Sequence, residues 1–351
     1  MLIINPVRNS ESYPNKDMPA EENMKINLNR IKRVSWLWML LSGLIITESL
    51  NAGETYTNPV LVRTINIAGA NPDQFTGILG IGDPTVISDN GQYYLYPTGD
   101  NRSYDVYISS DLVNWKAGPK VFESAERGVW APDVFHDPSD HKFDLYYTVN
   151  RRVGVAVSDR PDGTFKNMKT LVRGAIDAHM FLDDDGRYYL YYVEYPAFRI
   201  SVQPMETPLR KSGKPVQIIS PGDPWEQNHV PITEAPWMIK HNGTYYLLYS
   251  GGSADTRHYA IGYATAKAPA GPFIKYPDNP VAKEGDGIFG PGHVSVTKDR
   301  AGTLWMVYHQ QKDETRGWNR IICIDRLWFD EQGVLHVKPT RSTPQPAPVT
   351  K

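Results

Sequence analysis

The stretch TEAPWMIKHNGTYYLLYSGG, residues 233–252, places a charged side chain directly before a pattern typical of a β-hairpin. Glu234 opens the stretch, a short apolar segment follows, and the chain turns at Asn242-Gly243 before it returns as TYYLLYS. Asn-Gly between two runs of aromatic and aliphatic residues is a strong hairpin signal, because the turn requires positive φ. The stretch therefore predicts two antiparallel strands, with a carboxylate at the start of the first.

The same layout occurs four more times along the chain, at residues 82–100, 132–150, 176–194 and 292–310. The lead residues are spaced by 50, 44, 57 and 59 residues: Asp83, Asp133, Asp177, Glu234 and His293. A period near 50 residues built from short strands is typical of a β-propeller. A third strand follows each hairpin. We therefore predict a single all-β domain, a five-bladed β-propeller with four-stranded antiparallel blades. The lead residues should open the innermost strands at one end of the central channel.

Composition supports a globular domain and argues against a nucleic-acid partner. The 351 residues are 40% hydrophobic, and the formal net charge is −2. This is enough for a packed core, and no basic patch or charge run suggests a nucleic-acid partner. Cys323 is the only cysteine, so no disulfide can form within the chain, and its apolar strand RIICID predicts a buried, unreactive thiol.

The N-terminus has the composition of a signal peptide. Residues 24–33 are basic, residues 34–47 are an apolar run of 14, and small residues follow in ESLNAGE. This order is typical of export, and the run is too short for an ordinary membrane span. The alternative is a short membrane anchor. We expect residues 1–52 to be a leader and signal peptide, with Met24 as an alternative start. The mature catalytic domain, residues 53–351, would be secreted or periplasmic and free of the membrane.

Three carboxylates at one end of a channel indicate acid–base chemistry. Hydrolysis of a glycosidic bond needs one carboxylic acid to protonate the leaving oxygen and one carboxylate on the opposite face. A gap of about 6.5–9.5 Å admits a water molecule and gives inversion. A third carboxylate nearby would raise the pKa of the acid. The alternative for each residue alone is a strand cap or turn residue, but three equivalent positions favour a functional site.

The ordered set of motifs resembles glycoside hydrolase family 43, from about residue 58 to residue 338. The resemblance implies that Asp83 in GDPTVI is the general base and that Glu234 in TEAPW is the general acid. It implies that Asp177 in IDAHMF tunes the pKa of the acid and orients it. The element WAPD, residues 130–133, also matches the family and places Trp130 and Asp133 beside the substrate.

Two further positions follow from the resemblance. In WNRIICIDRLWFDEQG, Arg320 matches an arginine that binds the sugar, and the alternative is a surface ion pair. In GPGHVSV, His293 matches a histidine near the channel axis, beside a calcium ion or a water cluster. The alternative for His293 is a hydrogen-bonded structural residue without a metal.

Other side chains are candidates for contact with the substrate. His179 follows Asp177 by two residues and should point the same way on a regular strand, so it either reaches the site or packs in the channel. Four aromatic residues could stack on a sugar: Trp130, Trp237, Phe289 and Trp318. We favour Trp130, because it lies in the WAPD element.

These features predict an inverting glycosidase that acts on the ends of oligosaccharides or polysaccharides from plants or algae. The expected terminal sugars are α-L-arabinofuranose or β-D-xylose, with galactose as a further option. The chemistry itself would require no cofactor, although a structural calcium ion in the channel is one alternative. Two departures, EAP for the family's EGP and IDA for its IDP, leave the sugar open. The alternatives are a sugar-binding propeller without activity and a related enzyme of fructan or anhydro-galactose specificity.

Overall fold

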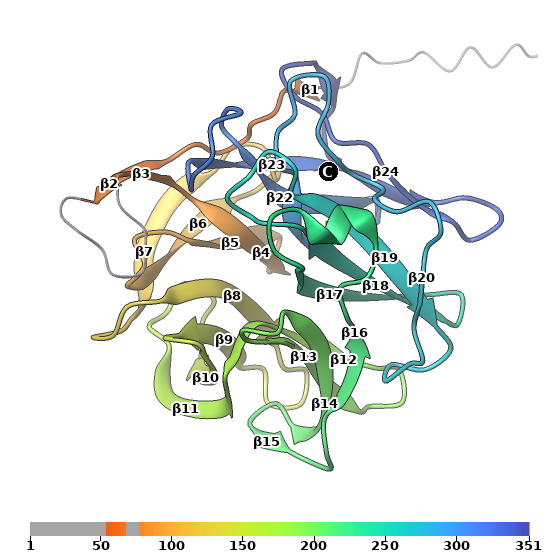
Figure 1. Cartoon of the computed structure of the whole chain (residues 1–351). Coiled ribbons are helices and arrows are strands. Elements are labelled where there is room, and N and C mark those ends of the chain that lie inside the picture. Colours follow the sequence, from red (N-terminus) through yellow and green to blue (C-terminus); the bar gives the residue numbers. More distant parts are fainter. Residues whose placement is uncertain (1–53, 68–76, 351) are drawn as a thin grey trace, which may run out of the picture. The chain divides into compact units, whose positions relative to one another are not determined.

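Five antiparallel sheets, one per blade, follow one another along the chain in the computed structural model, which describes residues 54–67 and 77–350 (Figure 1). Blade one comprises β4 (Gly82–Asp89), β5 (Gln92–Thr98), β6 (Ser103–Ser109) and β7 (Lys116–Glu123). Blade two comprises β8 (Val129–His136), β9 (Phe143–Val149), β10 (Arg152–Ser158) and β11 (Lys166–Arg173). Blade three comprises β12 (Ala175–Leu182), β13 (Tyr188–Glu194), β14 (Arg199–Thr207) and β16 (Val216–Ile219), with β15 (Arg210–Lys211) added beside β14.

The last two blades complete a ring. Blade four comprises β17 (Thr233–His241), β18 (Thr244–Gly251), β19 (Ala260–Ala266) and β20 (Ile274–Lys275). Blade five comprises β21 (Gly292–Lys298), β22 (Leu304–Gln311), β23 (Arg320–Phe329) and β24 (Leu335–Val337). The first strand of each blade contacts the first strand of the next, and β21 contacts β4. The prediction of an all-β, five-bladed propeller is therefore confirmed.

Apolar clusters fill the spaces between neighbouring blades, one cluster for each pair. Consecutive residues of β18 point to opposite faces of the sheet and so contribute to two different clusters. Leu247 packs towards blade three, and Leu248 packs towards blade five. Both faces of each inner strand are thus buried, which explains why TYYLLYS has no polar alternation. Cys323 is buried in the cluster between blades four and five, as predicted.

The hairpin turns form as the sequence predicts. Asn90 and Gly91 have φ of 46° and 75°, and Asn242 and Gly243 have φ of 47° and 72°. Positive φ at both central residues is the reason for Asn-Gly at these turns.

A bulge at the start of each innermost strand fixes the site. One residue per blade adopts φ between 43° and 53° there, and the strand pairing shifts around it. We call these five the head residues: Asp83, Ala131, Asp177, Ala235 and His293. The predicted equivalence of lead residues is therefore wrong in two blades. Asp133 lies two residues beyond its head residue, and Glu234 lies one residue before.

Short elements outside the blades include β1 (Thr55–Tyr56), which pairs with β25 (Gln345–Pro346), and β2 (Thr64–Ile67), which pairs with β3 (Gly77–Gly80). The 3₁₀ helix η1 (Pro224–Gln227) precedes blade four. Within the described residues no helix is long and apolar enough to cross a membrane. The predicted leader and signal peptide, residues 1–52, lie outside the described part of the chain.

Candidate active site

Asp83, the head residue of blade one, is a buried carboxylate surrounded by cationic and imidazole groups. Its Oδ1 lies 2.6 Å from Nη1 of Arg320 and 3.3 Å from Nδ1 of His293. Burial alone raises the pKa of Asp83, but the positive charge of Arg320, with the adjacent His293 ring, outweighs burial and holds the pKa well below its usual range. Asp83 is therefore ionised at neutral pH.

Glu234 lies on β17 and is in the opposite state. Its Oε1 accepts a hydrogen bond of 2.7 Å from the hydroxyl of Tyr259. Burial raises the pKa of Glu234 to about 7, the charge of Asp83 adds to the rise, and the Tyr259 bond and Arg320 offset part of it. Glu234 thus keeps a proton well above the pH at which an exposed glutamic acid loses it.

Asp177, the head residue of blade three, touches the chain beside Glu234. Its Oδ2 accepts a hydrogen bond of 3.2 Å from the backbone N–H of Ala235. The pKa of Asp177 is raised to about 7, chiefly by burial and also by the charges of Glu234 and Asp83, while His293 and the Ala235 amide offset part of the rise. The site therefore contains one carboxylate that is held ionised and two that are held near their titration point, a pattern typical of acid–base catalysis.

Arg320, the first residue of β23, is buried and paired with Asp83, so the surface ion pair considered for it is wrong. Its guanidinium also lies 5.4 Å from the centre of the Trp318 ring. A Cβ on Gly82 would come within 2.3 Å of the guanidinium carbon. Glycine before Asp83 is thus needed to admit the arginine from the neighbouring blade.

Asp133 and His179 lie two residues beyond the head residues of their blades and line the central channel. Asp133 accepts hydrogen bonds from the Thr85 hydroxyl at 3.1 Å and from the Met180 amide at 2.8 Å. The ring of His179 is buried and stacks on Trp237 at 4.1 Å. This position favours channel packing for His179, and substrate contact by either residue stays a prediction.

Trp130 is half-buried next to the head residue of blade two. Its Nε1 donates a hydrogen bond of 2.7 Å to Asn101, and the Arg151 guanidinium lies 5.7 Å from its ring centre. These contacts fix the orientation of the indole. Stacking of Trp130 on a sugar stays a prediction. The ring of Trp237 instead stacks on the ring of His179 in the channel.

His293, the head residue of blade five, lies beside Asp83 as described above. Its backbone N–H donates to the Ser250 hydroxyl at 2.9 Å. Among residues 54–67 and 77–350, no three His, Cys, Asp or Glu side chains are grouped so that they could hold a metal ion. Calcium prefers six to eight oxygen ligands. The side chains around His293 do not form such a set, and no catalytic step is assigned to a metal here.

Sequence reasoning missed two aromatic members of the site. Tyr259 donates to Glu234 and stacks on His309 with ring centres 5.6 Å apart. Nδ1 of His309 accepts the backbone N–H of Asp83 at 3.1 Å. Burial lowers the pKa of His309 to about 4, so the ring is neutral, and its Nε2 carries the proton. Tyrosines are frequent throughout the strands, so nothing in the sequence distinguishes Tyr259 from a core residue.

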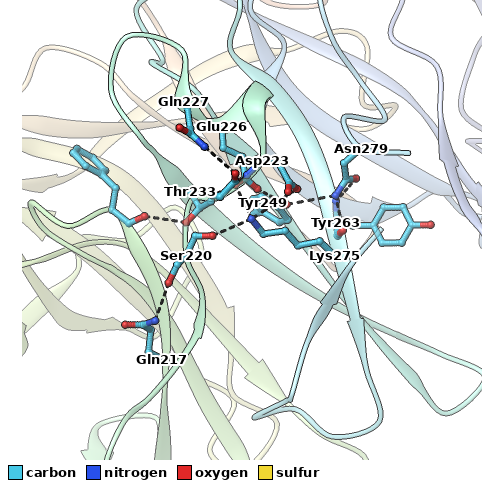
Figure 2. A network of polar contacts seen from close by, with 12 residues as sticks. Gln217, Ser220, Asp223, Glu226, Gln227, Thr233, Tyr249, Tyr263, Lys275 and Asn279 are labelled. Carbon is cyan, nitrogen blue, oxygen red and sulfur yellow. Dashed lines mark hydrogen bonds and ion pairs between the residues drawn. The ribbon is translucent and has the colours of Figure 1, made fainter. Parts of the chain in front are cut away.

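A buried polar network secures the segment that leads into Glu234 (Figure 2). The side chain of Glu226, on η1, is fully buried and accepts hydrogen bonds from Nζ of Lys275 at 2.6 Å and from the Tyr249 hydroxyl at 2.7 Å. It also accepts the backbone N–H groups of Gly222 and Asp223. The carbonyl of Glu226 then accepts the N–H of Ile232, two residues before Glu234. The segment before Glu234, which forms one wall of the site, is therefore held in place by the Glu226–Lys275 ion pair.

Comparisons with known proteins agree with this geometry. A β-D-galactofuranosidase from Aspergillus niger is 30% identical over 325 residues, covering 84% of this chain and 92% of that protein. A xylosidase/arabinosidase from Bacteroides ovatus is 28% identical, covering 72% and 93%. The crystal structure of a thermostable family-43 glycoside hydrolase superposes with a TM-score of 0.73 at 36% identity, covering 84% of this chain and 99% of that one. The family model for glycosyl hydrolases family 43 matches residues 80–335. The chain therefore belongs to glycosyl hydrolase family 43 and is a glycosidase.

Proposed function

We propose that this glycosidase removes terminal α-L-arabinofuranosyl or β-D-xylosyl residues from plant or algal polysaccharide fragments, with inversion of configuration. The observation that carries the proposal is the opposite protonation of two buried carboxylates. Arg320 holds Asp83 ionised, and burial holds Glu234 protonated up to about pH 7. One base and one acid in a single site are what inverting hydrolysis requires.

Each carboxylate has one role in the proposed reaction. Asp83 takes a proton from a water molecule as the water oxygen bonds to the anomeric carbon. Glu234 gives its proton to the glycosidic oxygen as the bond from that oxygen to the anomeric carbon breaks. Asp177 orients the backbone next to Glu234, and the mutual repulsion of the two carboxylates opposes the ionisation of both. The remaining N–H groups of Arg320 are donors for sugar hydroxyl oxygens.

The choice of sugar is supported by the relatives. One is a xylosidase/arabinosidase and another is a β-D-galactofuranosidase. α-L-Arabinofuranose and β-D-galactofuranose share their ring configuration and differ only in the chain beyond ring carbon 4. A site that recognises this ring would accept both, so β-D-galactofuranose is the form of galactose that we include.

The test is hydrolysis of a panel of nitrophenyl glycosides and defined oligosaccharides. We expect turnover of α-L-arabinofuranoside, β-D-xyloside or β-D-galactofuranoside, and release of single terminal sugars from the oligosaccharides. Proton NMR during the first minutes should show the inverted anomer. Saturable binding without product would identify a sugar-binding propeller, and a retained anomer would indicate the nucleophilic mechanism of the fructan-cleaving relatives.

We also propose that the protein is exported. The proposal is supported by the order of basic, apolar and small residues over residues 24–52. A polysaccharide substrate outside the cell is consistent with this location.

A further inference from the structure

The backbone N–H groups of the head residues follow one rule in four of the five blades. Each donates a hydrogen bond to a side chain on the second strand of the preceding blade. The bonds, with the donor first, are Ala131 to Thr98 at 2.7 Å, Asp177 to Thr148 at 3.2 Å, His293 to Ser250 at 2.9 Å and Asp83 to His309 at 3.1 Å. The rule ties neighbouring blades together at the end of the channel that carries the site.

The acceptors occupy one structural position. Each lies on its second strand opposite the residue that precedes the head residue of the same blade. The pairs are Thr98 with Gly82, Thr148 with Trp130, Ser250 with Glu234, and His309 with Gly292. In blade three the corresponding pair is Val193 with Ile176. The side chain of valine has no acceptor atom, so Val193 cannot accept a hydrogen bond from the N–H of the head residue of blade four.

The exception falls on the amide next to Glu234. The N–H of Ala235 is the donor that Val193 cannot satisfy, and a buried donor without a partner is unfavourable. Oδ2 of Asp177 accepts it at 3.2 Å instead. The carboxylate that belongs to the site is thereby held against the peptide bond that joins Glu234 to Ala235.

We propose that Val193 is a positioning residue: by offering no acceptor to the Ala235 amide, it directs the Asp177 carboxylate onto the backbone beside Glu234. The proposal rests on the proposed function for its kinetic consequences only. Val193 itself is fully buried in the apolar cluster between blades three and four and touches no reacting atom. The valine thus acts through Asp177.

The direct test is Val193→Thr, which adds an acceptor with little change in shape. In a crystal structure of the variant, we expect the Ala235 N–H to bond to the new hydroxyl and the Asp177 carboxylate to turn away. Loss of this donor removes a group that lowers the pKa of Asp177, so that pKa rises. The other groups that act on it are His293, Glu234 and Asp83.

The kinetic consequence has a defined sign. The charges of Glu234 and Asp177 repel each other, so a neutral Asp177 lets Glu234 lose its proton at lower pH. The alkaline limb of the kcat profile should move down by about half a pH unit or more. The kcat for an alkyl glycoside should fall roughly tenfold, and the kcat for a dinitrophenyl glycoside should fall less.

Two controls separate this effect from damage to the core. Val193→Ala removes packing but adds no acceptor, so it should lower the thermal midpoint and leave the Asp177–Ala235 bond and the alkaline limb in place. Val202→Thr adds the same hydroxyl to another fully buried valine of the same cluster, on β14, and should leave both in place as well. Val193→Ser supplies the acceptor in a smaller side chain if the threonine variant does not fold.

A Val193→Thr or Val193→Ser structure that keeps the Asp177–Ala235 bond would overturn the proposal. So would an alkaline limb that stays in place, or one that moves equally in Val202→Thr. The crystal structure and a carbon-13 NMR titration of the Asp177 carboxyl need no substrate. They therefore decide the role of Val193 even if no glycoside is hydrolysed, in which case the proposed function fails separately.

Discussion

Arg320 Nη1 lies 2.6 Å from Asp83 Oδ1 and thereby joins the last blade to the first at the site. The pair is 237 residues apart in sequence, and both side chains are largely buried. The contact is possible only after the ring of blades has closed. The protonation of Asp83 therefore depends on the complete propeller.

Arg320→Met should move the acid limb of the kcat/KM profile to higher pH. The guanidinium favours the ionised form of Asp83, and without it burial dominates and the pKa of that carboxyl rises. Since the base must be ionised to accept a proton, activity is lost at the acid side first. We expect a shift of at least about one pH unit, measured on a nitrophenyl glycoside. Arg326→Met, at an exposed position of the same strand, is the matched control. An acid limb unmoved by Arg320→Met would contradict the assignment of Asp83.

Glu234→Gln should slow alkyl glycosides far more than dinitrophenyl glycosides. An alkyl leaving group needs the proton, whereas dinitrophenolate departs without it. General acid catalysis contributes roughly 10²–10⁴-fold, so the two losses should differ by about that factor. Asp83→Asn removes the base and should slow both substrates together. Equal losses in Glu234→Gln would transfer the acid role to Asp177, because His179 is stacked in the channel.

Tyr259→Phe should move the alkaline limb to higher pH. The Tyr259 hydroxyl donates to Glu234 and favours its ionised form, which opposes the larger effect of burial. Without the hydroxyl the pKa of Glu234 rises above about 7, and the acid stays protonated to higher pH. Tyr191→Phe removes a similar buried bond, to the Pro269 carbonyl, and should leave the limb unchanged. A downward shift in Tyr259→Phe would show that the hydroxyl stabilises the protonated acid instead.

The sequence predicted the fold because each repeat carries its own local signals. Asn90-Gly91 and Asn242-Gly243 set turns, and the strand runs between them are continuous where both faces are buried. The register of the strand starts is harder to predict, because each bulge adds one residue and a following proline marks only three of the five head residues. Aligning the prolines of GDPT, WAPD and EAPW would have placed Asp133 beyond its head residue.

The contacts within the site could not be predicted, because they join residues from different strands and blades. Thr148 and His309 reach Asp177 and Asp83 only when the ring brings neighbouring blades together. Tyr259 reaches Glu234 within blade four, from the position just before β19. Val193 carries no polar atom, and only the comparison of five equivalent positions reveals its effect.

Export predicts the N-terminus of the mature protein. If residues 24–52 are removed after targeting, N-terminal sequencing of protein from the periplasm or medium should begin near Gly53. Replacing Leu40 and Leu41 with Arg interrupts the apolar run and should leave the protein in the cytoplasm. Recovery of cytoplasmic protein that begins at Met1 or Met24 in the unaltered chain would refute export.

Glu226→Ala should destabilise the fold far more than loss of a surface ion pair. The substitution leaves the ammonium of Lys275 partly buried without this carboxylate and frees two backbone N–H groups and the Tyr249 hydroxyl. Breaking a buried pair from one side costs about 3–5 kcal/mol in the free energy of unfolding. Glu123→Ala is the matched control, since the Lys120–Glu123 pair is exposed to solvent and contributes little to stability. Urea titration measures both, and equal midpoints for the two variants would show that the network of Figure 2 does not stabilise this wall of the site.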